Sequence, residues 1–116
     1  MRPEFFPTRA HLLVCTDPSC RDRGADLLYR ALWQGLERER LAYYQRGGNL
    51  RLTEAGCLGA CRFGPNITCY YRKGGELREA WYHGMDYPAA MALARALHAG
   101  EEPPAERRFD AAAANE

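Results

Sequence analysis

The chain has 116 residues, of which 27% are charged, and its formal net charge is +1. That length suits one domain, and the near-neutral charge argues against a disordered chain and against strong attraction to nucleic acid or to a membrane surface. No apolar stretch approaches the roughly 20 residues that a membrane-spanning helix needs, and the first residues lack the pattern of a secretion signal. We therefore expect a cytoplasmic protein with no nucleic-acid or membrane partner.

The first half of the chain predicts a strand, a helix and a second strand. His11–Cys15 is a short apolar run followed by turn-forming residues, which is typical of a buried strand. Apolar residues then recur at helical spacing from Ala25 to Leu36, and Gly47-Gly48 breaks the pattern. In chain order we expect a lead-in over 1–10, a strand over 11–15, a helix that begins near 22–24, and a strand over 49–53.

The second half predicts a hairpin and a last helix. Two runs of β-forming residues are joined by Gly74-Gly75, which supplies the positive φ angles of a tight hairpin turn. Asp86 can cap a helix that has Pro88 in its first turn. In chain order we expect a strand over 66–71, a turn over 73–76, a strand over 76–82, a helix after Asp86 that ends at Gly100, and a flexible C-terminal tail over 101–116.

This order of elements predicts an α/β domain with the thioredoxin-like topology β-α-β-β-β-α. It consists of a central mixed four-stranded sheet with helices packed on it, and we place it over residues 11–100. The first two strands should be parallel, because a helix connects them by a right-handed crossover. Cys15 and the loop with Cys57 then both follow the carboxyl end of a strand. Open α/β sheets bind their ligands at that edge.

Four of the five cysteines fall into two pairs. Cys15 and Cys20 flank the turn after the first strand, and Cys57 and Cys61 share a glycine-rich loop. In a reducing compartment, such cysteines more often serve metal or redox chemistry than disulfides. Four thiolates suit a [2Fe–2S] cluster, a [4Fe–4S] cluster or a structural zinc ion. We interpret Cys69, which lies in a predicted strand, as a small buried hydrophobic residue.

Several short motifs follow one another in an order that is typical of one family. They are an apolar strand that runs into Cys15, then Cys20 before Gly24-Ala25, the loop Gly56-Cys57-Leu58-Gly59-Ala60-Cys61-Arg62-Phe63-Gly64-Pro65-Asn66, and Trp81-Tyr82-His83-Gly84. In this combination, which covers roughly residues 11–99, the sequence resembles the thioredoxin-like [2Fe–2S] ferredoxins.

The resemblance implies that Cys15, Cys20, Cys57 and Cys61 hold a [2Fe–2S] cluster. It also implies a soluble one-electron carrier rather than an enzyme, redox proteins as partners, and a homodimer. A four-thiolate cluster of this type carries about two negative charges when oxidised and about one more when reduced, so it needs nearby hydrogen-bond donors. Candidate backbone N–H donors belong to Arg21, Arg23, Leu58, Gly59, Ala60 and Phe63.

Other functions stay open on the sequence alone. The same four cysteines suit a zinc-stabilised interaction module, and a thiol–disulfide enzyme or an electron-transfer subunit of a larger redox complex are further alternatives. For an electron carrier, we expect a mixed contact face beside the cysteines. Leu58 and Phe63 would form its apolar centre, and Arg21, Arg23 and Arg62 its rim.

Overall fold

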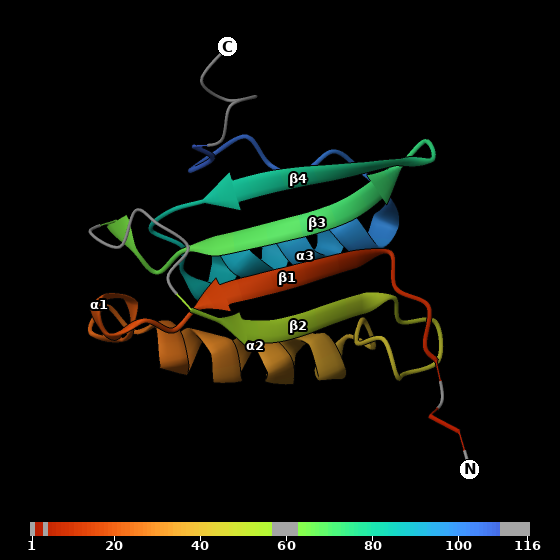
Figure 1. Cartoon of the computed structure of the whole chain (residues 1–116), viewed down its shortest axis with the longest axis horizontal. Coiled ribbons are helices and arrows are strands. Elements are labelled where there is room, and N and C mark those ends of the chain that lie inside the picture. The colour runs from red at the N-terminus through yellow and green to blue at the C-terminus, as the bar shows by residue number, and fades with distance from the viewer. Residues whose placement is uncertain (1, 4, 57–62, 110–116) are drawn as a thin grey trace.

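The structure is a computed structural model and describes residues 2–3, 5–56 and 63–109. Within these residues no helix is long and apolar enough to cross a membrane. The elements, labelled in Figure 1, are β1 (Ala10–Cys15), α1 (Pro18–Arg21), α2 (Ala25–Arg38), β2 (Leu50–Ala55), β3 (Ile67–Lys73), β4 (Glu76–Tyr82) and α3 (Tyr87–Ala99).

The four strands form one mixed sheet in the order β2-β1-β3-β4. β1 and β2 are parallel, with Cys15 opposite Ala55, whereas β3 is antiparallel to both β1 and β4. The two long helices, α2 and α3, lie behind the sheet in Figure 1, so the opposite face points toward the viewer. This arrangement confirms the predicted thioredoxin-like fold and the parallel pairing of the first two strands.

The segment between β1 and α2 differs from the prediction. The residues expected to form a plain turn include the short helix α1, with Pro18 in its first turn. Helix α2 begins at Ala25, because Gly24 before it has a φ of 91°, a left-handed conformation that a right-handed helix cannot include. The sequence analysis missed α1 because four residues are too few to show helical periodicity.

The core lies between the sheet and the two long helices. On β1 the side chains of Ala10, Leu12 and Val14 are buried, and Leu13 on the other face is only partly covered. α2 and α3 approach closely at Gly35, where an added Cβ would lie 2.6 Å from Tyr87 Oη. This contact explains why a glycine is placed in the middle of a helix.

The hairpin and the last helix follow the prediction closely. Gly74 and Gly75 form the turn with φ angles of 60° and 83°. The Asp86 carboxylate accepts a hydrogen bond of 2.9 Å from the Ala89 N–H and so caps α3. Gly100 ends the helix in a left-handed conformation.

The segment after Gly100 packs along β4 as far as the structure describes it. The Tyr82 hydroxyl donates to the Pro104 carbonyl at 2.6 Å, and Tyr82 also forms an isolated antiparallel bridge with Arg108. Pro103 is buried. The sequence predicts a flexible tail over 101–116; residues 103–109 of it make these contacts, and residues 110–116 lie outside the described residues. No sequence pattern signals them, because each joins residues about 20 or more positions apart.

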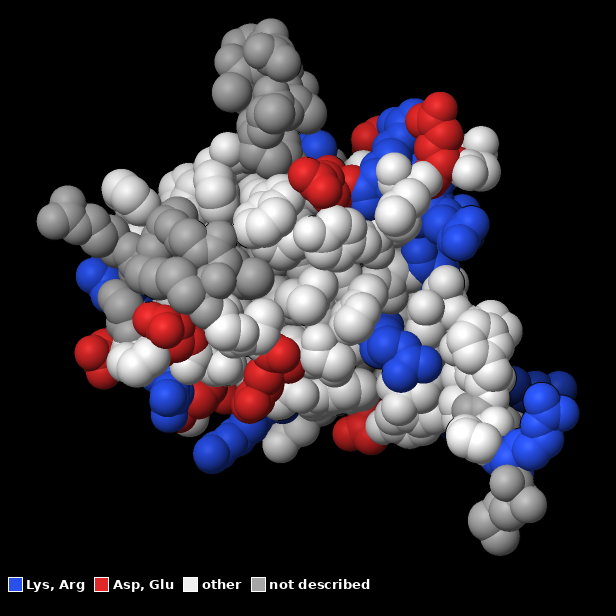
Figure 2. All heavy atoms as spheres, in the orientation of Figure 1, with Lys and Arg blue, Asp and Glu red and all other residues white. Residues whose placement is uncertain are grey.

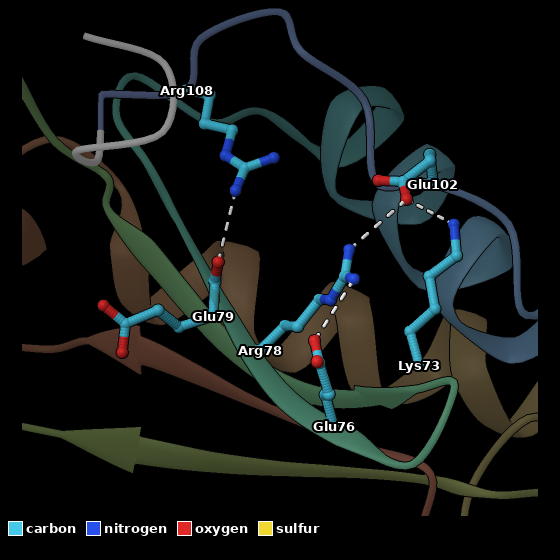
Figure 3. Close-up of polar contacts among 6 residues, drawn as sticks. All are labelled: Lys73, Glu76, Arg78, Glu79, Glu102 and Arg108. Atoms are coloured by element: carbon cyan, nitrogen blue, oxygen red, sulfur yellow. Dashed lines mark hydrogen bonds and ion pairs between the residues drawn. The ribbon is translucent and has the colours of Figure 1, made fainter. Parts of the chain in front are cut away.

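Charged side chains link the same segment to the β3–β4 hairpin. Glu102 accepts from Lys73 and also lies 3.9 Å from Arg78, whose guanidinium contacts Glu76 at 3.3 Å (Figure 3). The Arg108 guanidinium donates to the Glu79 carbonyl at 3.2 Å. Exposed ion pairs of this kind contribute little stability each. Their effect is to keep the segment beside the outer edge of β4.

Candidate metal centre

The first pair of predicted ligands lies at the carboxyl end of β1. Cys15 is the last residue of that strand and Cys20 lies in α1. Both are free cysteines with 0% exposure. The structure therefore places two thiols inside the protein at the sheet edge where the sequence predicts the ligand site.

A hydrogen-bonded turn connects these two cysteines. The Arg21 N–H donates to the Asp17 carbonyl at 2.9 Å, and the Arg21 Nε donates to the Thr16 carbonyl at 2.8 Å. The Arg23 N–H donates to the Cys20 carbonyl at 3.0 Å. Both N–H groups thus bond to main-chain carbonyls, and their predicted donation to cluster sulfur stays a prediction.

The second pair of predicted ligands, Cys57 and Cys61, lies outside the described residues. The ends of their loop are nevertheless well placed. At its start, the Ala55 carbonyl accepts from the Thr16 N–H at 3.0 Å and from Thr16 Oγ1 at 3.1 Å. At its end, the Asn66 carbonyl accepts from the Cys15 N–H at 3.1 Å. The loop that carries Cys57 and Cys61 thus leaves and returns beside Cys15.

The returning part of the loop is also bound to the turn between β4 and α3. The Gly84 N–H donates to the Phe63 carbonyl, and the Met85 N–H donates to the Pro65 carbonyl at 2.9 Å. The Gly64–Pro65 peptide bond is cis. Gly84 has a φ of 57°, and its N–H joins the motif Trp81-Tyr82-His83-Gly84 to the end of the loop. The role of this motif could not be predicted from the sequence, because the contact spans 21 positions.

The donor chemistry at this edge is that of sulfur. Among the described residues there is no group of three or more His, Cys, Asp or Glu side chains that could hold a metal ion. Two thiols come from Cys15 and Cys20, so a four-ligand site needs two more from the loop. The residues present fit a centre that is bound by thiolates, either iron–sulfur or zinc.

The other cysteine and two of the histidines occupy different places. Cys69 is fully buried in β3 opposite Leu12, three residues before Cys15 along β1 and therefore about 10 Å from that end of the strand. His11 bonds to Thr53 Oγ1 at 2.9 Å, and burial lowers its pKa, with a smaller contribution from the cation Arg51. His98 bonds to Asn49 at 3.0 Å.

The fold is that of a thioredoxin-like α/β protein, and two buried cysteines lie at the carboxyl end of β1. A scan against models of known protein families gives no match, and neither does a search of curated proteins. Among solved structures, the wild-type thioredoxin-like [2Fe-2S] ferredoxin from Aquifex aeolicus is similar, with a TM-score of 0.68 and 19% identity. The match covers 89% of this chain and 98% of that one.

Further structures of the same Aquifex aeolicus ferredoxin are similar to this chain to the same degree. One has a TM-score of 0.67 and 20% identity and covers 89% of this chain and 92% of its own. A cysteine-to-serine variant has a TM-score of 0.67 and 18% identity and covers 87% and 98%. At this level of identity, the similarity shows that the fold is shared.

Proposed function

We propose that this protein is a one-electron carrier, a ferredoxin, whose [2Fe–2S] cluster is held by the thiolates of Cys15, Cys20, Cys57 and Cys61. The observation that carries the proposal is the position of the cysteine loop, which starts and ends at hydrogen bonds to residues 15 and 16. The ends of the loop that carries Cys57 and Cys61 therefore lie at the sheet edge that Cys15 and Cys20 occupy. The shared fold with [2Fe-2S] ferredoxins supports the same function.

The described residues suit such a centre because they bury sulfur ligands and hold the backbone around them. The cluster would supply reversible one-electron chemistry without a bound substrate. Cys15 and Cys20 are shielded from water, and the bonds from Thr16, Gly84 and Met85 anchor both ends of the loop. A fixed ligand cage lowers the structural change on gaining an electron, which favours rapid transfer.

The proposal is tested on the purified protein. We expect a red-brown sample with visible charge-transfer bands, about two iron and two sulfide per chain, and a paramagnetic signal after reduction by dithionite. A colourless protein with one zinc per chain would instead identify the zinc-stabilised interaction module. A colourless protein without metal that catalyses thiol–disulfide exchange would identify the thiol–disulfide enzyme.

We also propose that the carrier is a cytoplasmic homodimer, in which the second copy covers the sheet face that α2 and α3 leave open. On this face Leu13 and Tyr70 are only partly buried, although they lie on β1 and β3. Figure 2 shows few charged groups across its middle. A sheet face with few charges and partly apolar side chains suits burial against an identical face. Its physiological partners would be a reductase and an electron acceptor.

A further inference from the structure

Four aromatic rings form a continuous row beside the candidate metal centre. The ring centroids of Phe63 and His83 lie 6.0 Å apart, those of His83 and Phe109 lie 5.9 Å apart, and those of Phe109 and Trp81 lie 6.4 Å apart. These spacings, with interplanar angles of 58–72°, fall in the range of favourable edge-to-face contacts. We call these four residues the aromatic array.

Three separate segments build the array. Phe63 ends the cysteine loop, Trp81 and His83 come from the end of β4, and Phe109 comes from the segment after α3. The backbone fixes them to one another: the His83 N–H donates to the Arg107 carbonyl at 3.0 Å, and the Phe109 N–H donates to the Trp81 carbonyl at 2.9 Å. The array is therefore positioned by main-chain pairing rather than by the packing of a core.

The array is accessible to a partner. Phe63 is 60% exposed and Phe109 is 38% exposed, whereas aromatic side chains usually bury most of their surface. Phe63 also comes two residues after Cys61. The exposed rings thus begin directly at the loop that carries two of the proposed ligands.

The charged groups that border the array balance one another. Arg107 contacts the Asp86 carboxylate at 3.3 Å and donates to the Gly84 carbonyl at 2.7 Å. The Glu79 carboxylate accepts from Trp81 Nε1 at 3.3 Å, and Arg108 donates to the Glu79 carbonyl. The charges of these four side chains balance one another, which favours an uncharged complementary surface on a partner.

We infer that the aromatic array is the docking surface for the redox partner, and that this partner presents an apolar surface without net charge around its own redox centre. The inference rests on the proposed electron-carrier function. Electron-transfer complexes are small and short-lived, and a few exposed aromatic residues can supply most of the affinity in such an interface. Docking here would place the partner directly against the cysteine loop.

The test uses an oxidised blue-copper protein whose copper lies beneath an apolar, uncharged surface. One electron passes from the reduced carrier to Cu(II), which becomes Cu(I), and the second-order rate is followed by loss of the blue colour. We expect Phe109→Ala and Phe63→Ala to slow this step by about fivefold, with little dependence on salt. Phe5→Ala is the matched control, because Phe5 is 83% exposed in the N-terminal segment outside the array.

A small oxidant separates docking from the redox centre itself. Ferricyanide needs no extended docking surface. The rate at which it oxidises the reduced carrier should therefore be the same for the natural protein and for its Phe109→Ala, Phe63→Ala and Phe5→Ala variants. If Phe109→Ala and Phe5→Ala change the blue-copper rate equally, the inference is wrong. The inference also fails if Phe109→Ala converts a dimer to a monomer, because the array would then be a contact between copies of this chain.

A second readout does not depend on electron transfer. The zinc-substituted blue-copper protein, added at a saturating concentration, should slow amide hydrogen exchange at residues 81–84 and 107–109. Slower exchange confined to α2, α3 or the N-terminal segment would contradict the inference. Visible bands and dithionite reduction are measured first. If the visible bands are absent, both the electron-carrier function and the docking surface are refuted. If the bands are intact but Phe109→Ala and Phe5→Ala change the blue-copper rate equally, only the docking surface is refuted.

Discussion

At the scale of single residues, position in a strand separates two cysteines that are equally buried. Cys15 and Cys69 lie in neighbouring strands and both have 0% exposure. Cys15 ends its strand and bonds through its N–H to the returning cysteine loop. Cys69 is in mid-strand, with Leu12 and Ala80 as its neighbours across the sheet. We therefore assign Cys15, and not Cys69, to the proposed cluster.

This difference predicts opposite effects of alanine at the two kinds of position. Cys15→Ala, Cys20→Ala, Cys57→Ala or Cys61→Ala should each remove most of the visible absorption and the bound iron, because a four-ligand centre loses a whole thiolate. Cys69→Ala should retain both and cost about 1 kcal/mol of unfolding free energy, the scale of removing one buried group of methyl size. Iron analysis and visible spectra give the answer. Bleaching by Cys69→Ala with retention in Cys20→Ala would show that Cys69 is a ligand in place of Cys20.

Asp86 gives α3 a pH-dependent cap. The hydrogen bond from the Ala89 N–H lowers the pKa of the Asp86 carboxyl, and the Arg107 cation acts in the same direction. Because the pKa is lower in the folded than in the unfolded protein, the carboxylate stabilises the fold at neutral pH. That contribution is lost as the pH falls below about 4, where the unfolded chain takes up the proton first.

Asp86→Asn should flatten this acid dependence. Asparagine is also a good N-cap and accepts the same bond, but it does not titrate. We expect the thermal unfolding midpoint of the natural protein to fall more steeply between pH 5 and about pH 3 than that of the variant. Glu39 and Glu102 also have lowered pKa values, but they titrate in both proteins and cancel in the comparison. Parallel curves for the two proteins would exclude this role of Asp86.

At the scale of elements, the sequence correctly predicted the helix and strand boundaries that are set by interactions between residues close together in the chain. Strand β4 begins and ends where the sequence predicts, because paired glycines and alternating side chains set the hairpin. α3 has the cap and the terminal glycine that the sequence indicates. α1, the packing of the segment after Gly100 and the anchoring of the cysteine loop by Gly84 were not predicted. Each depends on a very short helix or on contacts between distant parts of the chain.

The same reasoning applies to the candidate site. Cys15 and Cys20 lie at the predicted edge of the sheet, and the ends of the loop with Cys57 and Cys61 meet that edge. The carboxyl ends of two parallel strands could be located from sequence periodicity alone. The supporting bonds from Thr16, Gly84 and Met85 could not, because they follow from the tertiary fold.

Gly35 shows how the packing of two elements can outweigh helix propensity. Gly35→Ala would gain about 1 kcal/mol from helix propensity. Its Cβ, however, would lie 2.6 Å from Tyr87 Oη and 2.8 Å from Met91 Sδ, and such overpacking typically costs about 1–3 kcal/mol. We therefore expect a net loss of about 1 kcal/mol in the free energy of unfolding, measured by urea denaturation.

Two further variants test this explanation for Gly35. Gln34→Ala, at the exposed neighbouring position of α2, should leave stability nearly unchanged. Tyr87→Phe combined with Gly35→Ala removes the nearest atom and should recover part of the loss. A Gly35→Ala protein that is more stable than the natural one would show that α3 can move aside at little cost.

At the scale of the whole molecule, the sheet has two very different faces. α2 and α3 cover one of them, and the other carries partly buried Leu13 and Tyr70 with few charges across its middle (Figures 1 and 2). The outer edge of β4 is occupied near its end by residues 107–109. Pairing of two molecules through this end of β4 is therefore less favoured than packing of two open faces. This argument gives the proposed homodimer a defined interface.

The homodimer can be tested by placing one charge on each of two leucines. Leu13→Glu puts a carboxylate in the middle of the open face, where dimerisation would remove it from water without a partner, so the variant should sediment as a monomer at micromolar concentration. Leu27→Glu is the matched control, since Leu27 is 65% exposed on α2 and lies away from that face. It should remain a dimer, and both variants should retain the visible spectrum. If the natural protein sediments as a monomer with its visible spectrum intact, the dimer is excluded. If Leu13→Glu remains a dimer, the interface must lie on another surface.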